Sequence, residues 1–308
     1  MREKKNKNDN VNDVNGKRDN KKAAGKFKNW TTALSMELRE HKSSAIVYFT
    51  LRALVIIMLV LQLLNRNYEN VFLCILTLLL LVIPSLAQIT FKVELPTALE
   101  IIILVFIFSA EILGEISEFY LVFPFWDTVL HTLNGFLAAA IGFSLVDLLN
   151  RSDRTVFSLS PLFTAIVAFC FSMTIGVVWE FFEFGMDQFL GYDMQKDTVL
   201  SAITSVMLNP DGRNIPVTID QIREVMINGQ PLGVGGYLDI GLIDTMKDLL
   251  VNFVGAVVFS VAGYFYARSK GKKRAAALNF VPSKKNEDHD YLQQARENGP
   301  DLPEKRKK

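Results

Sequence analysis

The sequence predicts an all-α integral membrane protein with six transmembrane helices and a small extracellular insertion. Half of the 308 residues are hydrophobic, and phenylalanine alone accounts for 23 of them. The apolar residues form long blocks instead of the alternation expected of amphipathic helices or strands. Basic residues gather in the two tails. Together these features are typical of a chain that crosses a lipid bilayer several times.

Six apolar segments are long enough to cross the ~30 Å hydrocarbon layer, which takes about 20 residues of helix. The third segment carries Glu100, Glu111 and Glu115, and the fifth ends among acidic residues, so hydropathy alone would suggest five. The segments are residues 44–64, 70–91, 98–118, 127–149, 161–184 and 246–267. They define a membrane domain over residues 44–268.

The charge distribution orients these segments. Residues 1–42 hold 12 Lys and Arg against 6 Asp and Glu, and residues 268–308 hold the same numbers. Because cytoplasmic flanks are enriched in Lys and Arg, both termini are expected in the cytoplasm, which requires an even number of spans. The connection 191–240 is rich in acidic residues and is expected outside. We therefore expect a multi-pass protein of the cell membrane.

The tails differ from the membrane domain. Residues 1–43 are predicted to be a disordered basic tail, because the first 28 are dominated by Lys, Asn and Asp and offer little to bury. Within this tail, Trp30, Leu34 and Leu38 lie four residues apart, which predicts a helix on the membrane surface. An extension of the first span explains that spacing equally well. Residues 269–308 form a second basic cytoplasmic tail. Neither tail interleaves aromatic residues with basic ones, so the expected partners are membrane lipids and not nucleic acid. The sequence names no protein partner.

The connection 191–240 has its own pattern. An alternating stretch covers residues 215–219, a helix-like stretch covers 220–227, and three glycines precede the last span. These features allow a small cap that closes over the polar residues described next, although a plain re-entry turn would also explain the glycines.

Three polar stripes lie at the ends of the last three spans, at spacings that keep each stripe on one side of its helix. The predicted topology brings all three to the outer face, where Glu111, Glu115 and Glu118 add a further acidic stripe. Ionisable groups at the edge of hydrocarbon are costly unless they pair or bind something, so the stripes indicate a site. They are Asp127 and His131; Glu180, Glu183 and Asp187; and Asp244, Asp248 and Asn252.

Each of these residues also has a purely structural interpretation. Asp127 and Asp244 stand where they can cap a helix N-terminus. His131 and Asn252 can bridge neighbouring helices by hydrogen bonds. Glu180 and Asp248 are harder to explain in this way, because like charges in a region of low dielectric repel each other unless a proton or a cation offsets them.

The same residues carry a resemblance to known membrane proteins. The order of motifs DxxxHxxxGF from Asp127, WExxE from Trp179 and DTxxDxxxNxxG from Asp244 resembles that of YjdF-like inner-membrane proteins and, more loosely, VanZ-like proteins. The resemblance covers about residues 127–265 and implies a bacterial envelope setting more than a reaction. Glu183 departs from the VanZ-like pattern, which usually has Gln there.

Carboxylates, an imidazole and an amide form a hard donor set that suits Mg²⁺, Mn²⁺ or Ca²⁺, and His131 also admits Zn²⁺. The leading hypothesis is a metal-dependent hydrolase or transferase that acts on an envelope lipid or lipid-linked substrate at the outer face. The expected metal ligands are Asp127, His131, Glu183 and Asp248, the expected base is Glu180 or Asp244, and the expected supporting residues are Asp187 and Asn252. A cation- or proton-coupled transporter and a non-catalytic membrane scaffold are the alternatives.

Overall fold

A computed structural model of the chain describes residues 28–37, 42–150, 159–269, 282–285 and 290–298. The described residues form two compact units, which we treat separately. Of the described residues, the first holds 28–37, 42–123, 147–150, 269, 282–285 and 290–298, and the second holds 124–146 and 159–268. Residues 1–27, on which the prediction of a disordered tail rests, lie outside the described part of the chain.

The prediction of an all-α multi-pass membrane protein is confirmed. Six helical segments within the described residues are long and apolar enough to cross a membrane, in the order expected from the sequence. The fifth and sixth are longer than predicted, because helix extends beyond the apolar core into the acidic stripes. The segments are Ser43–Leu64, Tyr68–Thr90, Thr97–Ile116, Trp126–Asn150, Pro161–Leu190 and Leu242–Arg268.

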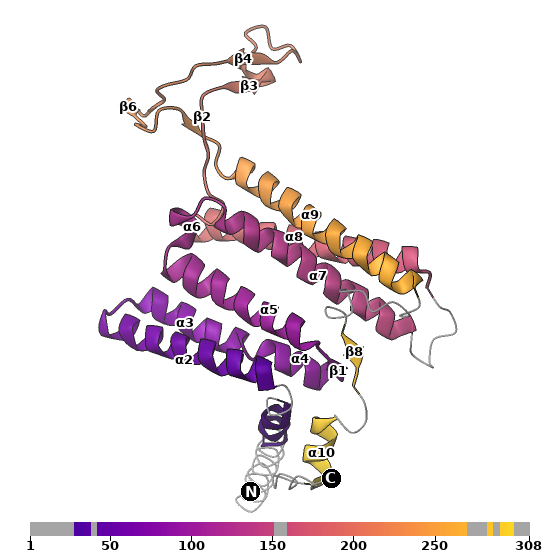
Figure 1. The fold of residues 1–308 in the computed structure, drawn as a ribbon. Coiled ribbons are helices and arrows are strands. Elements are labelled where there is room, and N and C mark those ends of the chain that lie inside the picture. Colours follow the sequence, from indigo (N-terminus) through magenta and orange to yellow (C-terminus); the bar gives the residue numbers. More distant parts are fainter. Residues whose placement is uncertain (1–27, 38–41, 151–158, 270–281, 286–289, 299–308) are drawn as a thin grey trace, which may run out of the picture. The chain divides into compact units, whose positions relative to one another are not determined.

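The first unit contains the first three spans (Figure 1). The first is α2 (Lys42–Leu64), and the second is divided into α3 (Tyr68–Leu80) and α4 (Ile83–Phe91). Pro84 begins α4 and lacks the N–H needed to continue the helix from α3. The third span joins α5 (Thr97–Phe108) to a π-helical segment, η1 (Ser109–Ile116), which the short helix α6 (Phe119–Val122) follows.

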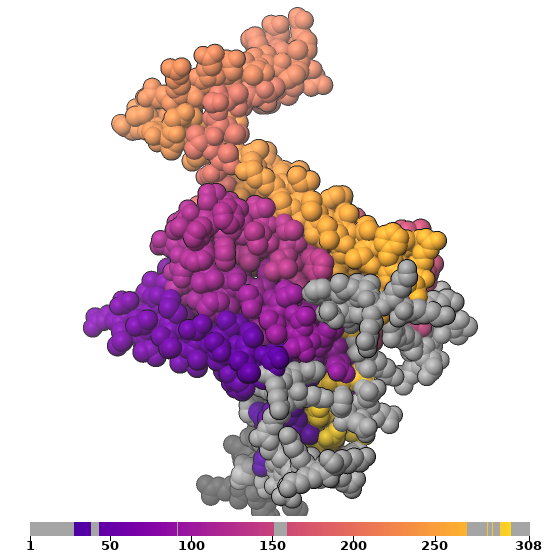
Figure 2. Space-filling view, in the orientation of Figure 1, coloured from indigo at the N-terminus to yellow at the C-terminus, as the bar shows by residue number. Residues whose placement is uncertain are grey.

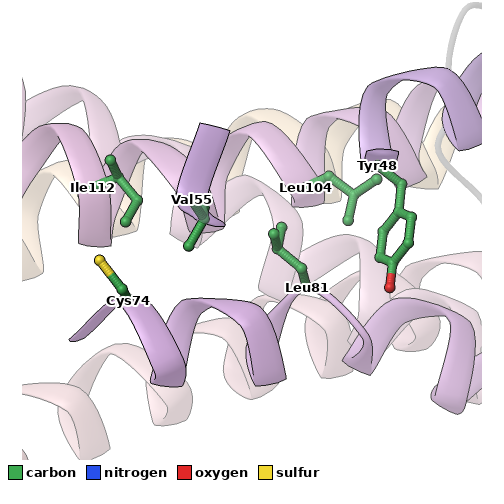
Figure 3. Close-up of a cluster of buried hydrophobic side chains, with 6 residues drawn as sticks. All are labelled: Tyr48, Val55, Cys74, Leu81, Leu104 and Ile112. Atoms are coloured by element: carbon green, nitrogen blue, oxygen red, sulfur yellow. The ribbon is translucent and has the colours of Figure 1, made fainter. Parts of the chain in front are cut away.

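Apolar side chains from these helices pack into the core of the first unit. Tyr48 and Val55 come from α2, Cys74 from α3, and Leu104 from α5, and each is at most 6% exposed (Figure 3). Leu81 and Ile112 complete the buried cluster. The outward residues of the same helices, such as Phe49 and Phe72, remain more than half exposed, as expected for a surface that faces lipid.

The two tails meet at one end of the first unit. Strand β1 (Val93–Glu94) pairs antiparallel with β8 (Ser283–Lys284), and α10 (Tyr291–Asn298) follows. The helix over residues 28–37 buries Ala33 against Ile89 and Ala295, with Trp30 packed at the margin. Part of its apolar face therefore has a protein partner, while Trp30 and Leu34 are only partly buried and a place for this helix on the membrane surface stays a prediction.

Charged groups join the same tail module. The Lys285 ammonium contacts the Glu37 carboxylate, and both residues are buried. Lys92 Nζ lies 2.6 Å from Asp290 Oδ2. A buried pair of opposite charges is costly to break, because the partner left behind would be uncompensated. These contacts hold the described parts of the N- and C-terminal tails together.

The second unit is built on three long helices, α7 (Trp126–Asn150), α8 (Pro161–Leu190) and α9 (Leu242–Arg268). Helix α8 begins where the Ser160 side chain accepts a hydrogen bond from the Phe163 N–H, and it ends at Gly191 in the left-handed conformation. Glycines bring the helix backbones together, since a Cβ on Gly135 or Gly255 would collide with the main chain of the facing helix. This close packing fixes the relative positions of side chains on α7 and α9.

The insertion between α8 and α9 forms three short antiparallel ladders. Strand β2 (Val199–Leu200) pairs with β7 (Tyr237–Leu238), β3 (Ile203–Ser205) with β4 (Val217–Ile219), and β5 (Met226–Ile227) with β6 (Gln230–Pro231). A short 3₁₀ turn, η2 (Val206–Leu208), follows β3. The ladders extend away from the helices of the second unit (Figures 1 and 2).

The two secondary-structure predictions for the insertion have opposite outcomes. The alternating stretch 215–219 does contain a strand, β4. The expected helix over 220–227 is wrong, because that stretch runs irregularly into β5. A helix there would have had little to pack against, since most residues of 219–231 are exposed.

Candidate metal centre

The polar residues of α7, α8 and α9 meet at one end of the second unit. His131 lies at the centre of this group. Its Nε2 is 3.4 Å from Asp127 Oδ1 on the same helix and 4.0 Å from Asp248 Oδ2 on α9. Its Nδ1, on the other edge of the ring, is 3.8 Å from Glu180 Oε1 on α8. The imidazole therefore stands between carboxylates from three helices.

Two sets of donor atoms in this cluster are close enough to hold a metal ion. Asp127, His131 and Asp248 form one set, and Glu180, Glu183 and Asp248 form the other. Within each set, one donor atom from each residue lies within 4.8 Å of the others. The four predicted ligands are thus brought together, and Glu180, predicted as a base, joins them.

Most of the cluster is buried in the protein. Asp248, Glu180 and Glu183 are 3%, 4% and 8% exposed, and only Asp127 is partly open, with a third of its side chain accessible. Among the described residues, no hydrogen-bond donor lies within 3.5 Å of either oxygen of Glu180 in a suitable geometry, and the nearby Thr245 hydroxyl is engaged as an acceptor by Gln195. A buried carboxylate without hydrogen bonds is costly, because it has lost its hydration and gained nothing in return.

Trp179 holds Glu183 in place. Its indole Nε1–H donates a 2.8 Å hydrogen bond to Glu183 Oε1, which leaves Oε2 for another partner. The two residues are one helical turn apart on α8. Trp179 belongs to the WExxE motif, where its spacing of four from Glu183 is the signal for this contact, but the motif alone did not predict its role.

Asp187 and Asp244, beside the cluster, hold the start of the insertion. Asp187 accepts hydrogen bonds from the backbone N–H groups of Met194 and Gln195, at 2.6 and 2.9 Å. Asp244 Oδ2 accepts one from the Lys196 N–H at 2.8 Å. Neither aspartate belongs to a donor set, and both lie within helices instead of capping them.

Two further residues of this region were missed by the sequence analysis. Gln195 is nearly buried, and its side-chain amide donates to the Thr245 hydroxyl. Asp239 accepts hydrogen bonds from the N–H groups of Thr198 and Ile243, both at 2.7 Å. Asp239 therefore has the capping role at the start of α9 that we considered for Asp244. Such contacts depend on the path of the loop and have no signature in spacing.

Asn252 supports the cluster from one turn deeper in α9. It is fully buried, and its Oδ1 accepts a 3.2 Å hydrogen bond from Asn134 Nδ2 on α7. Its amide nitrogen lies 3.5 Å from the Ser172 carbonyl oxygen on α8. Asn252 thus ties three helices together directly below Asp248. The other predicted acidic stripe, Glu111, Glu115 and Glu118, belongs to the first unit and to neither donor set.

The six spans and the polar cluster within them define a multi-pass α-helical membrane protein. More particularly, residues 46–269 match the family described as "Predicted membrane protein (DUF2238)", and the chain belongs to that family. The match includes every residue of the cluster, five spans in full and the first span from residue 46. No curated protein and no solved structure matches the chain.

Proposed function

We propose that the second unit carries a divalent metal centre and acts as a metal-dependent hydrolase or transferase on an envelope lipid or lipid-linked substrate. The observation that carries this proposal is Glu180, a buried carboxylate without a hydrogen bond, 3.8 Å from His131. Around it lie three more carboxylates in the two donor sets. Such a cluster is stable when a cation offsets its charge.

The donor types indicate which cation suits the centre. Carboxylate oxygens are hard ligands preferred by Mg²⁺, Mn²⁺ and Ca²⁺, and one imidazole also suits Zn²⁺. His131 can offer one ring nitrogen to a metal while the other faces a carboxylate, an arrangement that orients metal-binding histidines in many proteins. Trp179 similarly orients Glu183.

A metal at this place would polarise a phosphoryl or acyl group. In hydrolysis, the water oxygen bonds to phosphorus or carbon while the bond to the leaving oxygen breaks, and a carboxylate takes the water proton and passes it to that oxygen. Glu180 and Asp244 are the two candidates for this base. Glu180 has both oxygens without hydrogen bonds, whereas Asp244 keeps one oxygen beyond its contact with Lys196.

The surroundings of the cluster favour a substrate that enters from the membrane. Phe181, Phe184 and Phe189, on the same end of α8, are 70%, 52% and 82% exposed. Their exposure is comparable with that of the lipid-facing Phe49 and Phe72 of the first unit, so this end of α8 borders the bilayer. With both termini in the cytoplasm, as the charge distribution predicts, this end faces outward in a cell membrane. The motif resemblance to YjdF-like and VanZ-like proteins supports the same setting.

The two alternatives explain less. A proton or cation relay requires polar groups that continue along the helices. Asn134, Asn252 and Ser172 continue the cluster by one turn, but beyond them Ser144 and Thr174 donate their hydroxyl hydrogen bonds back to their own helices. A scaffold that only fastens helices accounts for Asn252 but not for a buried Glu180 without hydrogen bonds. The enzyme proposal accounts for both.

The test combines metal content with turnover. Detergent-purified wild type and a Glu183→Gln, Asp248→Asn double variant are compared by elemental analysis and by release of phosphate or acyl groups from membrane lipids and lipid-linked diphosphates. We expect bound Mg, Mn, Ca or Zn and chelator-sensitive turnover in the wild type only. Asp211→Asn, at the exposed tip of the insertion, is the control. Bound metal without turnover would overturn the enzyme, and a metal-free wild type of equal thermal stability would overturn the centre itself.

A further inference from the structure

We infer that the centre binds two divalent cations bridged by Asp248, and that its substrate is a phosphate ester carried on a membrane lipid. This inference rests on the proposed metal centre and deepens it. The first ground is geometric. Asp248 belongs to both donor sets found in the described residues, with Asp127 and His131 on one side and Glu180 and Glu183 on the other.

The imidazole ring of His131 separates the two sets. Its Nε2 faces Asp127 and Asp248, while its Nδ1, on the opposite edge, faces Glu180. A cation bound to Nε2 would lie on the side of Asp127 and Asp248, away from the ring edge that faces Glu180. Cation–oxygen bonds of about 2.1 Å place donors roughly 3 to 4 Å apart, so the observed limit of 4.8 Å in each set needs only small side-chain movements.

The charge of the cluster gives the second ground. When fully ionised beside a neutral imidazole, the four carboxylates carry four negative charges, three of them on residues that are at most 8% exposed. One divalent cation would leave two charges uncompensated in a region of low dielectric, whereas two cations neutralise the cluster. Glu180 has no hydrogen bond from a described residue within 3.5 Å and belongs only to the second donor set. A cation bound there would therefore give its carboxylate a partner.

The helix packing holds Asp248 where a bridge requires it. Asn252, one turn below, is tied to Asn134 and approaches Ser172. Two turns below, Gly255 brings α9 against the backbone of α7 at Thr132. Asp248 is therefore placed by a rigid stretch of α9 between α7 and α8, and each of its two oxygens can serve one cation.

Two cations about 3.5–4 Å apart are typical of enzymes that cleave phosphate esters, because the pair stabilises both the attacking and the leaving oxygen. Because the exposed phenylalanines place this end of α8 beside the bilayer, we take the phosphate to be carried on a lipid. With Glu180 in the second donor set, Asp244 is left as the proton acceptor. In the hydrolysis, the water oxygen bonds to phosphorus, the bond to the lipid oxygen breaks, and the water proton passes through Asp244 to that lipid oxygen.

A one-metal centre is the competing arrangement. In it, His131 Nε2 binds the single cation with Asp127 and Asp248, and Nδ1–H donates to Glu180, which orients the ring. The two arrangements differ in the number of cations and in the role of Glu180, and both differences can be measured.

The experiment counts Mn²⁺ in the purified full-length protein and measures magnetic coupling between the ions by electron paramagnetic resonance. We expect two coupled Mn²⁺ per chain in the wild type. Asp127→Asn and Glu180→Gln should each reduce the count to one and abolish the coupling, and Asp248→Asn should lower the affinity for both ions. Asp211→Asn should keep two. The wild-type spectrum by itself shows whether two coupled ions bind, so the test does not depend on every variant folding.

The outcomes separate this inference from the proposed function. One uncoupled Mn²⁺ in the wild type, retained in Glu180→Gln, would overturn the two-metal centre and leave the one-metal enzyme standing. Two ions that persist in all three cluster variants would place them elsewhere and overturn the inference. A wild type that binds no Mn²⁺, Mg²⁺, Ca²⁺ or Zn²⁺ would overturn both proposals. For the substrate class, release of acyl groups but never of phosphate would contradict the phosphate ester.

Discussion

Gly255 illustrates how a single residue sets the geometry of the centre. A Cβ at this position would collide with the Thr132 carbonyl oxygen of α7. We expect Gly255→Ala to lower the free energy of unfolding by about 1–3 kcal/mol, the usual cost of overpacking. The matched control is Gly185→Ala on α8, where a Cβ would meet nothing within 4 Å. That change should be neutral or raise the stability by up to about 1 kcal/mol.

Thermal unfolding of the two glycine variants in the same detergent checks this prediction. Gly255→Ala should also weaken metal binding, because α9 must move away from α7 and take Asp248 with it. Equal melting temperatures for the two variants would show that α7 and α9 do not pack as closely as described.

At the residue scale, the sequence predicted the cluster well where spacing alone decides the outcome. Spacings of three and four placed Asp127 with His131 and Glu180 with Glu183 on single helix faces, and the structure brings these four together. Asp187 and Asp244 followed the same spacing but bind backbone N–H groups of the insertion. Periodicity gives the face of a helix; it does not give the partner that reaches that face.

At the element scale, the start of the insertion depends on Asp187. This carboxylate accepts two backbone hydrogen bonds, from residues 194 and 195. We expect Asp187→Ala to leave these N–H groups without their acceptor and to loosen residues 192–198, with faster hydrogen exchange and faster proteolysis there. The melting temperature of the helices should change little, because the lost contacts lie outside their packing.

Asp211→Ala serves as the control for this loosening, since Asp211 lies in the insertion, is largely exposed and pairs only loosely with Arg213, at 3.6 Å. Unchanged exchange over 192–198 in Asp187→Ala would mean that Asp244 and Asp239 hold the insertion by themselves.

The tail module gives a prediction about pH. Burial would raise the pKa of the Asp290 carboxyl, but the nearby Lys92 ammonium and the Gln293 N–H together bring it below its ordinary value. A lowered pKa in the folded state means that the contact stabilises the module fully above the unfolded pKa of about 3.9 and is lost as the pH falls through the lower folded value. We therefore expect α10 to loosen in acid, below about pH 4.

Hydrogen exchange of residues 291–298, corrected for the intrinsic effect of pH, measures this loosening. Asp290→Asn removes the titrating group and its ion pair with Lys92 but keeps an acceptor for the Gln293 N–H, so its exchange at pH 7 should be faster than in the wild type and should depend less on pH. A wild type with the same protection at pH 3 and pH 7 would contradict the prediction. No sequence pattern indicated this module, because its contacts join Lys92 and Glu37 to residues 290 and 285, far along the chain.

At the scale of the whole molecule, the fold class was predictable because a membrane span needs only length and apolar composition, and both can be read locally. The insertion and the tail module were not, since their structure depends on pairings between distant segments, such as Val93 with Lys284 and Val199 with Leu238. The division of the six spans into two units of three likewise has no signature in hydropathy.

Six spans place both termini on one side of the membrane, and the basic tails predict that this side is the cytoplasm. We test this with single cysteines in a variant with Cys74→Ala and Cys170→Ala, labelled in intact cells by a membrane-impermeant maleimide. Asp211→Cys in the insertion should be labelled, whereas Asn6→Cys and Asn298→Cys should react only after lysis. Labelling of one tail alone would contradict the six-span count. Labelling of both tails but not the insertion would reverse the orientation and place the centre at the cytoplasmic face, where an outer-leaflet lipid could not reach it.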